Sequence, residues 1–180
     1  LYLKHNFMNR CQVLTAEDGV EALKLLNKYN VSLIISDWMM PNMDGEELCR
    51  KIRQNPKTSH IPFIMLTAKT DDDSKVKSMD IGVDAFIAKP FSMRYLDACV
   101  RNLMAKRKQL MEEFAGSPEE PIAKIADNAL DSSLLTQMEK IIEDNVNNPA
   151  LNVNFVAQQL GMSRSGLFAK IKALTDTTPN

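Results

Sequence analysis

The distribution of apolar residues limits the folds open to this chain more than any other feature. Two runs, VSLIISD (31–37) and IPFIMLTA (61–68), are apolar on consecutive residues and do not alternate with polar ones. Consecutive apolar residues are typical of strands that are buried on both faces of a parallel sheet. CQVLTA (11–16) and DAFIAK (84–89) are shorter candidates for the same sheet.

Segments with helical periodicity separate these strands. They cover residues 17–29, 45–55 and 72–82, and the last ends at Gly82, a residue suited to a helix C-cap. A longer helix is predicted from Ser92 to about Phe114; its charged end, AKRKQLMEEF, is either solvated or paired with a copy of itself. The alternation of strands and helices predicts an α/β fold with a doubly wound parallel sheet.

The composition is that of a soluble globular protein. Of the 180 residues, 44% are hydrophobic and 25% are charged, and the net charge of −1 argues against a basic coat for nucleic acid. No apolar stretch approaches the ~20 residues that a membrane span needs. Cys11, Cys49 and Cys99 form no CxxC motif, which predicts reduced core thiols and not zinc ligands or disulfides.

A change of character marks the C-terminal third. AGSPEEP (115–121) is rich in residues that break helices, and beyond it the strand-like runs are replaced by helical patterns over 132–146 and 152–174. The second of these contains a turn at Gly161 between two short helices. We therefore expect an α/β domain over 1–109, a helical linker over 110–131 and a small all-α module over 132–180.

Three polar residues stand at the ends of three predicted strands. Asp37 ends one strand, Thr67 ends another, and Lys89 ends a third. In open α/β sheets such strand ends converge on one crevice, where ligands and catalytic groups collect. A carboxylate nucleophile, a hydroxyl and an ammonium group together suit phosphoryl transfer.

Two segments carry a resemblance to a known family. IISDWMMPNMDG resembles the phosphoacceptor segment of the receiver domains of two-component response regulators, and DAFIAKPF resembles their last strand and lysine–proline turn. The resemblance covers about residues 1–114. It implies that Asp37 is the phosphoacceptor, that the backbone carbonyl of Met39 is a Mg²⁺ ligand, that Thr67 is the switch hydroxyl, and that Lys89 pairs with the phosphate.

The same resemblance carries two further expectations. The Lys89–Pro90 bond should be cis. Phe86 occupies the position of the aromatic switch residue, which is often Tyr in the family, so here it can report the state of the site by burial but not through a hydroxyl.

The start of the chain departs from the family pattern. Receivers carry a pair of acids at the end of their first strand that bind Mg²⁺, but LYLKHNF resembles the tail of the first helix. DDD at 71–73 is expected to begin a helix instead. Since the first strand lies between the second and third in the order 2-1-3-4-5, its loss leaves an apolar slot. We expect the natural protein to carry this strand upstream, with the metal site incomplete here and the strand cut off, left out or replaced by a neighbouring chain.

A phosphatase of the haloacid dehalogenase type is the rival enzyme. That chemistry needs a second acid two residues after the nucleophile, and the position is held by Met39. The chain is therefore expected to be a signalling protein and not an enzyme.

The segment VNFVAQQLGMSRSGLFAKIKAL resembles the first of two helix-turn-helix motifs in AraC-type transcription factors. Its spacing predicts that Leu167, Ile171 and Leu174 are buried and that Ser163 caps the second helix. The residues expected to contact DNA are Ser163, Arg164, Ser165, Lys170 and Lys172, with Arg164 and Ser165 at base edges and the two lysines at phosphates. Half of such a domain should bind DNA weakly. The alternative is a plain helical hairpin with solvated basic residues.

Together these resemblances imply a response regulator that is phosphorylated by a histidine kinase, forms a homodimer and controls transcription. The combination is similar to hybrid sensor kinases fused to AraC-type outputs, so the kinase domain can belong to the same parent chain. We expect a cytoplasmic fragment without membrane contact, from a parent that can be anchored in the inner membrane. The alternative is a phosphorylation-independent dimerisation or interaction module of a transcription regulator.

Overall fold

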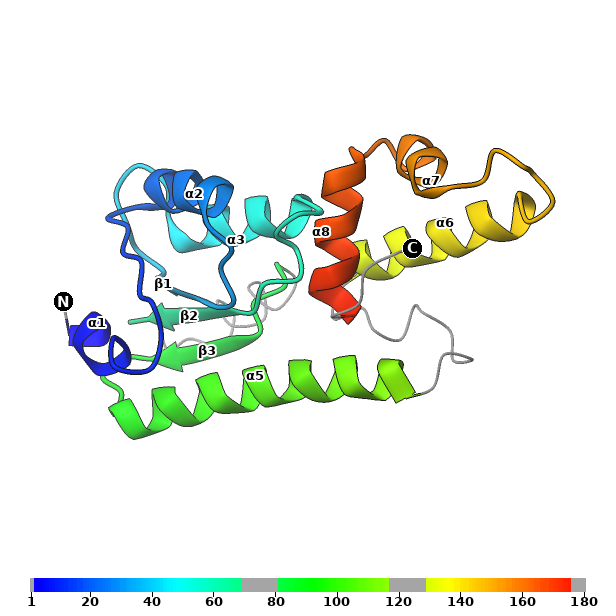
Figure 1. The fold of residues 1–180 in the computed structure, drawn as a ribbon. Helices are drawn as coiled ribbons and strands as arrows, with labels where there is room; N and C mark the ends of the chain where they lie inside the picture. Colours follow the sequence, from blue (N-terminus) through cyan, green and yellow to red (C-terminus); the bar gives the residue numbers. More distant parts are fainter. Residues whose placement is uncertain (1, 69–80, 117–128, 176–180) are drawn as a thin grey trace. The chain divides into compact units, whose positions relative to one another are not determined.

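The computed structural model describes residues 2–68, 81–116 and 129–175 (Figure 1). Contacts between residues divide the chain into two units. Unit 1 comprises Leu1–Lys51 and Phe63–Phe91, and unit 2 comprises Ile52–Pro62 and Ser92–Asn180.

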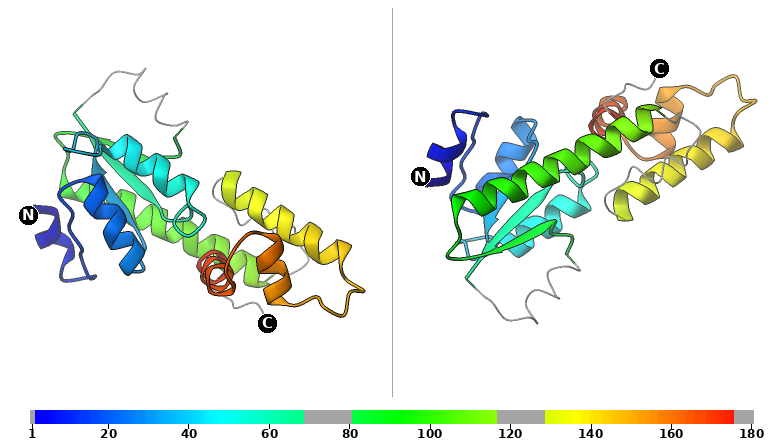
Figure 2. Two further views of the ribbon diagram at one scale, coloured as in Figure 1. Left: turned by 90° about the horizontal axis from the view of Figure 1, so that it is seen from above. Right: turned by 90° about the horizontal axis from the view of Figure 1, so that it is seen from below.

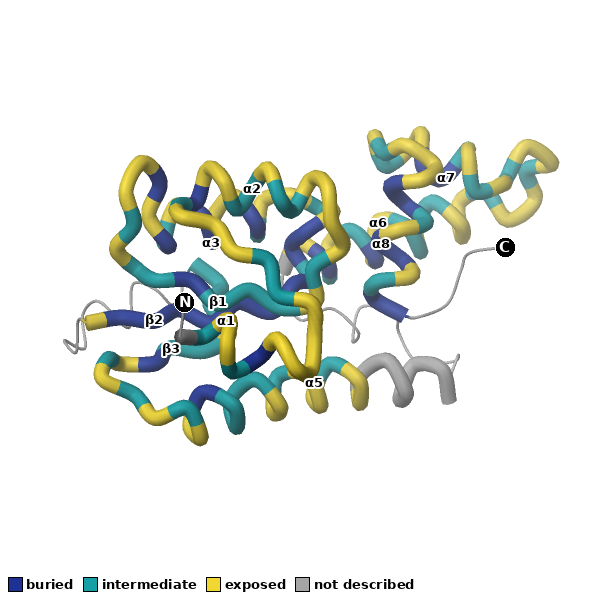
Figure 3. The backbone as a smooth tube through the Cα atoms, turned by 60° about the vertical axis from the view of Figure 1, so that its left-hand side comes forward, coloured by how far each residue is buried: buried dark blue, intermediate teal, exposed yellow. Residues whose placement is uncertain are grey.

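Unit 1 is built on a parallel sheet. Its strands are β1 (Ile34–Asp37), β2 (Phe63–Thr67) and β3 (Ala85–Ala88), in the order β1-β2-β3. Every residue of the central strand β2 is buried, as the dark blue segment in Figure 3 shows. The consecutive apolar residues of 61–68 thus belong to a strand that is buried on both faces, as the sequence predicts. The α/β class with a parallel sheet is confirmed.

The helices α1 (Tyr2–Phe7), α2 (Gly19–Lys28) and α3 (Gly45–Gln54) accompany this sheet. α2 and α3 lie on the same side of it (Figure 2). Both begin at an aspartate: Asp18 Oδ1 accepts from the Glu21 amide at 2.8 Å, and Asp44 Oδ1 accepts from the Glu47 amide at 2.8 Å. These side chains satisfy amide groups that have no partner within the first helical turn.

The strand predicted over 11–16 is wrong, because the structure describes no strand there. A strand exists only where a neighbour pairs with it, and among the described residues β1 pairs with β2 alone. Leu14 and Ala16 instead line a cleft of about 410 Å³ together with Ile34 and Ile35 of β1. Glu17, Asp18 and Asp37 line the same cleft, so its wall carries both apolar and acidic side chains.

The three cysteines form no disulfide in the described part of the chain, and the prediction that they lie in the core holds only in part. Cys49 is buried and Cys99 is half-buried, whereas Cys11 is exposed. The amide and the thiol of Cys11 both donate to the Phe7 carbonyl, at 3.1 Å and 3.5 Å, so Cys11 continues the end of α1 and does not enter the sheet.

Unit 2 contains helices. These are α5 (Met93–Gly116), α6 (Ala129–Asp144), α7 (Val153–Gln159) and α8 (Arg164–Thr175). α6, α7 and α8 share a core that is formed by Leu135 of α6, Val156 and Ala157 of α7, and Leu167, Ile171 and Leu174 of α8. The predicted burial of the three α8 residues is therefore confirmed.

The connection between α7 and α8 follows the sequence closely. The Asn152 side chain caps α7 by accepting from the Phe155 amide at 3.1 Å, and Ser163 Oγ caps α8 by accepting from the Gly166 amide at 3.1 Å. Gly161 has a φ of 65°, a left-handed conformation that glycine adopts without steric cost. The predicted turn at Gly161 is confirmed.

Two helices of the structure can be compared with the predicted limits of the domains and the linker. α5 is one continuous helix across residue 109, and α6 begins at Ala129, inside the segment predicted as linker. The predicted helix over 72–82 and the acids at 71–73 lie mostly outside the described residues, although Gly82 has the φ of 85° that a C-cap requires. Among the described helices, none is long and apolar enough to cross a bilayer.

Candidate functional site

The three predicted polar residues converge at one edge of the sheet. Asp37 is the last residue of β1, Thr67 is the last residue of β2, and Lys89 follows β3 directly. The Lys89 amide donates to the Thr67 carbonyl at 2.7 Å, which brings the third strand end to the second. Lys89 Nζ forms an ion pair with Asp37 Oδ2. Parallel strands necessarily bring their carboxyl ends together, so this convergence follows from the order of the strands.

The three side chains differ in their exposure to solvent. The side chains of Asp37 and Lys89 are 41% and 37% exposed, while Thr67 is 3% exposed. An ion pair that is open to water to this degree contributes little to stability. The carboxylate and the ammonium are therefore held close to each other and remain accessible to a ligand from solvent.

The chain turns sharply after Asp37, and Gly45 makes that turn possible. The Gly45 amide donates to the Trp38 carbonyl at 2.9 Å. A Cβ at Gly45 would overlap the carbonyl oxygen of Asp37 and lie 2.7 Å from Sδ of Met65. The backbone at the start of α3 thus lies directly against the backbone of the candidate phosphoacceptor.

A contact between Asn42 and Asp18 holds the far side of this loop, and sequence reasoning did not predict it. Asn42 has a φ of 56°, and its side-chain amide donates to Asp18 Oδ2 at 2.6 Å. The hydrogen bonds from the Glu21 amide and from Asn42 lower the pKa of Asp18 below its usual range. Asn is the residue that most often joins Gly in left-handed turns, which is the one signal in the sequence that could have indicated this role.

The structure also describes Phe86, the predicted aromatic switch residue, and the Lys89–Pro90 bond. The rings of Phe86 and Trp38 are 6.4 Å apart at an angle of 41°, and both side chains are half-buried. The Lys89–Pro90 peptide bond is cis, as the resemblance to receiver domains implies.

The donors near Asp37 do not make a complete Mg²⁺ site by themselves. Mg²⁺ prefers carboxylate and other oxygen ligands in an octahedral arrangement. The described residues contain no group of three or more His, Cys, Asp or Glu side chains that could hold a metal ion. Asp18, which lines the same cleft, already accepts hydrogen bonds at both of its oxygens.

The second group of predicted residues lies on α8 and the turn before it. Ser163, Arg164, Ser165 and Lys172 are exposed. The Arg164 guanidinium lies 5.5 Å from the centre of the Phe168 ring, a cation–π arrangement that orients it at the helix surface. Ser163 Oγ is engaged as the cap of α8 and lies 3.3 Å from Ser165 Oγ.

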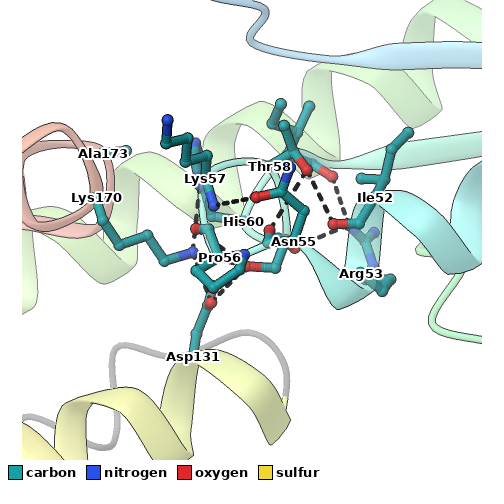
Figure 4. A network of polar contacts seen from close by, with 12 residues as sticks. Ile52, Arg53, Asn55, Pro56, Lys57, Thr58, His60, Asp131, Lys170 and Ala173 are labelled. Atoms are coloured by element: carbon teal, nitrogen blue, oxygen red, sulfur yellow. Dashed lines mark hydrogen bonds and ion pairs between the residues drawn. The ribbon is translucent and has the colours of Figure 1, made fainter. Parts of the chain in front are cut away.

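The predicted outward position of Lys170 is wrong. The sequence predicts an outward-facing lysine, but in the structure it is 1% exposed and forms an ion pair with Asp131 at 2.6 Å. Its ammonium also donates to Ser59 Oγ at 2.7 Å and lies 3.4 Å from His60 Nδ1 (Figure 4). Burial lowers the pKa of Lys170, and the charge of Asp131 opposes that change. Asp131, His60 and Ser59 lie 39, 110 and 111 positions away from Lys170 in the sequence, so no local pattern could reveal them.

Comparison with known proteins gives the family of the part of the chain that holds Asp37, Thr67 and Lys89. A family model described as "Response regulator receiver domain" matches residues 3–101, which is more than half of the chain. The chain belongs to the response regulator receiver domain family.

Relatives include both kinases and transcriptional regulators. The chain is 40% identical over 178 residues to "Histidine kinase P4" of Formosa agariphila, covering 99% of the chain but only 13% of that kinase. It is 31% identical over 172 residues to "Probable transcriptional regulator ycf29" of Pyropia yezoensis, covering 88% of the chain and 77% of that protein.

Solved structures agree on the fold. The signal receiver domain of a signal transduction histidine kinase from Syntrophus aciditrophicus is 37% identical with a TM-score of 0.54, over 58% of this chain and 80% of that one. The chemotaxis protein CheY4 of Vibrio cholerae is 30% identical with a TM-score of 0.53, over 56% and 85%. The sheet of unit 1 is thus that of a flavodoxin-like receiver.

Proposed function

We propose that Asp37 accepts a phosphoryl group from a histidine kinase. The observation that carries this proposal is the placement of an accessible carboxylate beside Lys89 and Thr67 at one edge of the sheet. The Asp37 carboxylate attacks the phosphorus of a phosphohistidine, the P–N bond breaks, and the acyl phosphate forms on Asp37. Lys89, which neutralises the carboxylate, then pairs with the phosphoryl oxygens, and Thr67 supplies a hydroxyl.

Mg²⁺ belongs to this proposal as a cofactor of the complete receiver, where it would neutralise charge on the phosphoryl group. In this chain the Asp37 carboxylate and the Met39 backbone carbonyl are the groups that we assign to it. Phe86 is proposed to respond to phosphorylation by a change in burial.

The test uses the full-length natural protein, treated with a small-molecule phosphodonor and Mg²⁺. We expect a mass increase of one phosphoryl group that is lost in Asp37→Asn and retained in Asp144→Asn, an exposed acid at the end of α6. Uptake that is unchanged in Asp37→Asn would remove Asp37 as the acceptor.

We further propose that the module over 132–180 is the first half of an AraC-type DNA-binding domain, with α8 as the helix that enters the major groove. The exposed Arg164 and Ser165 would contact base edges, and Lys172 would contact phosphate. The resemblance of the segment and the transcriptional regulators among the relatives support this output. Homodimerisation of the parent protein would then bring two such modules to paired sites.

The DNA-binding proposal is tested on the full-length protein, with DNA selected by it from a random pool. Arg164→Ala should lower affinity for selected DNA by 1–3 kcal/mol, on the order of ten- to a hundredfold, because a base contact is lost. Lys140→Ala changes an exposed cation of α6 and should leave affinity unchanged. Equal effects of the two variants would favour the plain helical hairpin.

The similarity to "Histidine kinase P4" along 99% of the chain favours a hybrid parent in which the kinase and the receiver share one polypeptide. The second candidate is a receiver that works without phosphorylation, as a dimerisation or interaction module. A pair of metal-binding acids at the end of the first receiver strand of the natural protein would support phosphorylation of Asp37. The absence of that pair from the natural protein would support the phosphorylation-independent module.

A further inference from the structure

Helix α8 buries two neighbouring faces, and only one of them belongs to the helical core. Leu167, Ile171 and Leu174 form the core face. Gly166 and Lys170 are also buried, and with Ala173 they follow each other at spacings of four and three residues along a second face. A short helix of a helical module that stood alone would expose this second face.

Residues from the turn between α3 and β2 cover the second face. A Cβ at Gly166 would lie 3.8 Å from Cε of Lys57, and the Lys170 ammonium bonds Ser59 Oγ at 2.7 Å. The same Ser59 hydroxyl donates to Asp131 Oδ1 at 2.7 Å, so a single serine bridges α6 and α8.

Arg107 of α5 closes the other end of the contact. Its guanidinium donates to the backbone carbonyl of His60 and, at 2.6 Å, to the carbonyl of Ala173. Arg107 thereby joins the turn to the last turn of α8. In the sequence the same residue interrupts the apolar series of the long helix.

The polar centre of this contact is suited to holding an orientation and not to adding much stability. The side chains of Lys170 and Asp131 are 0% and 1% exposed. Removing two charges from water costs nearly as much as their attraction returns, whereas removing one partner leaves an unpaired buried charge and is strongly unfavourable. Opening the contact returns both groups to water, so the closed and open states can be close in free energy.

We propose that residues 57–60 and Arg107 form a latch on α8, closed around the Lys170–Asp131 ion pair, and that opening it exposes Lys170 and releases the helix. In the closed state Lys170 is withheld from any ligand, and the orientation of α8 is fixed by the turn. The inhibitory consequence rests on the proposed DNA-binding function, but the latch itself does not.

Acylation of lysines with acetic anhydride tests the latch directly. Lys172 lies on the same helix and is exposed, so it serves as the internal reference. In the unaltered chain we expect Lys170 to react at least tenfold more slowly than Lys172, after each rate is divided by its rate in the urea-unfolded chain. Equal normalised rates would overturn the proposal.

Substitutions then separate a latch from ordinary burial. Ser59→Ala and Arg107→Met both lie outside the core of α6, α7 and α8, and both should raise the Lys170 rate several-fold while the far-ultraviolet circular dichroism spectrum is unchanged. Gln137→Ala, an exposed change on α6, should leave the rate as it was. Continued protection of Lys170 in both latch variants would show that the helices alone bury it and would overturn the proposal.

DNA binding provides the second readout. With full-length protein, Ser59→Ala should raise affinity for non-selected duplex DNA and steepen the dependence of log K on log salt by roughly 0.9, the contribution of one additional phosphate contact. Faster acylation of Lys170 with no change in either DNA quantity would overturn the inhibitory role. Loss of DNA binding by all forms, together with a latch that acylation supports, would instead overturn the proposed function.

Discussion

At the scale of single residues, the backbone at Gly45 lies so close to the Asp37 carbonyl that position 45 has no room for a side chain. Gly45 begins α3, and an alanine in an open helix position is normally favourable by about 0.5–1 kcal/mol relative to glycine. Here the added methyl group would overlap the Asp37 carbonyl and contact Met65 at 2.7 Å. Packing, and not helix propensity, therefore determines whether Gly45→Ala raises or lowers the free energy of unfolding.

Gly45→Ala should lower the free energy of unfolding by about 1–3 kcal/mol, the usual cost of overpacking. Urea denaturation measures it, and Glu47→Ala, an exposed change on the same helix, should stay within about 0.5 kcal/mol of the unaltered chain. A stabilised Gly45→Ala chain would mean that the backbone contact with Asp37 is absent in solution.

At the scale of elements, capping side chains determine where helices begin. α7 is only seven residues long, so its first turn is a large part of the helix. Asn152 has an extended backbone with φ of −157°, and its side chain accepts from the Phe155 amide at 3.1 Å. α7 in turn supplies Val156 and Ala157 to the core that it shares with α6 and α8.

Asn152→Ala should destabilise the helical module by ~1 kcal/mol, because the Phe155 amide loses its partner. Asn154→Ala replaces the same side chain at an exposed position inside α7, where alanine is the better helix former, and should be neutral or slightly stabilising. Thermal unfolding followed by circular dichroism compares the two. Equal effects would show that the cap does not set the start of this helix.

At the scale of the whole molecule, distant parts of the chain control the ionisation of one histidine. His60 is half-buried, and burial together with the charges of Lys170, Arg107 and Arg53 lowers its pKa from 6.5 to about 3, with Asp131 opposing them. The Lys170 ammonium can only donate, so at 3.4 Å His60 Nδ1 is the acceptor of a neutral ring, consistent with the lowered pKa.

His60 should make the chain less stable in mild acid. Below pH 6.5 the unfolded chain binds a proton at this residue while the folded chain does not until about pH 3, so the free energy of unfolding falls as the pH is lowered through this window. Between pH 7 and pH 5 the loss should reach about 2 kcal/mol, from 1.36 kcal/mol per unit, beyond that of His60→Gln. His5→Gln, at an exposed position, should retain the loss of the unaltered chain. Identical urea denaturation profiles for the chain and His60→Gln would contradict it.

The sequence by itself determined the features that depend on local pattern. Consecutive apolar residues identified β1 and β2, and the placement of Asp37, Thr67 and Lys89 followed because parallel strands bring their carboxyl ends together. Spacing also located the turn at Gly161 and the core face of α8.

Only the tertiary structure decided the features that depend on partners far away in the chain. Residues 11–16 have the composition of a strand, yet they form none, because a strand is stable only beside a paired neighbour. Lys170 has the appearance of a surface cation until Asp131 and Ser59 compensate for its loss of water. Pairing and desolvation are properties of the folded environment, so no window of sequence around either segment contains them.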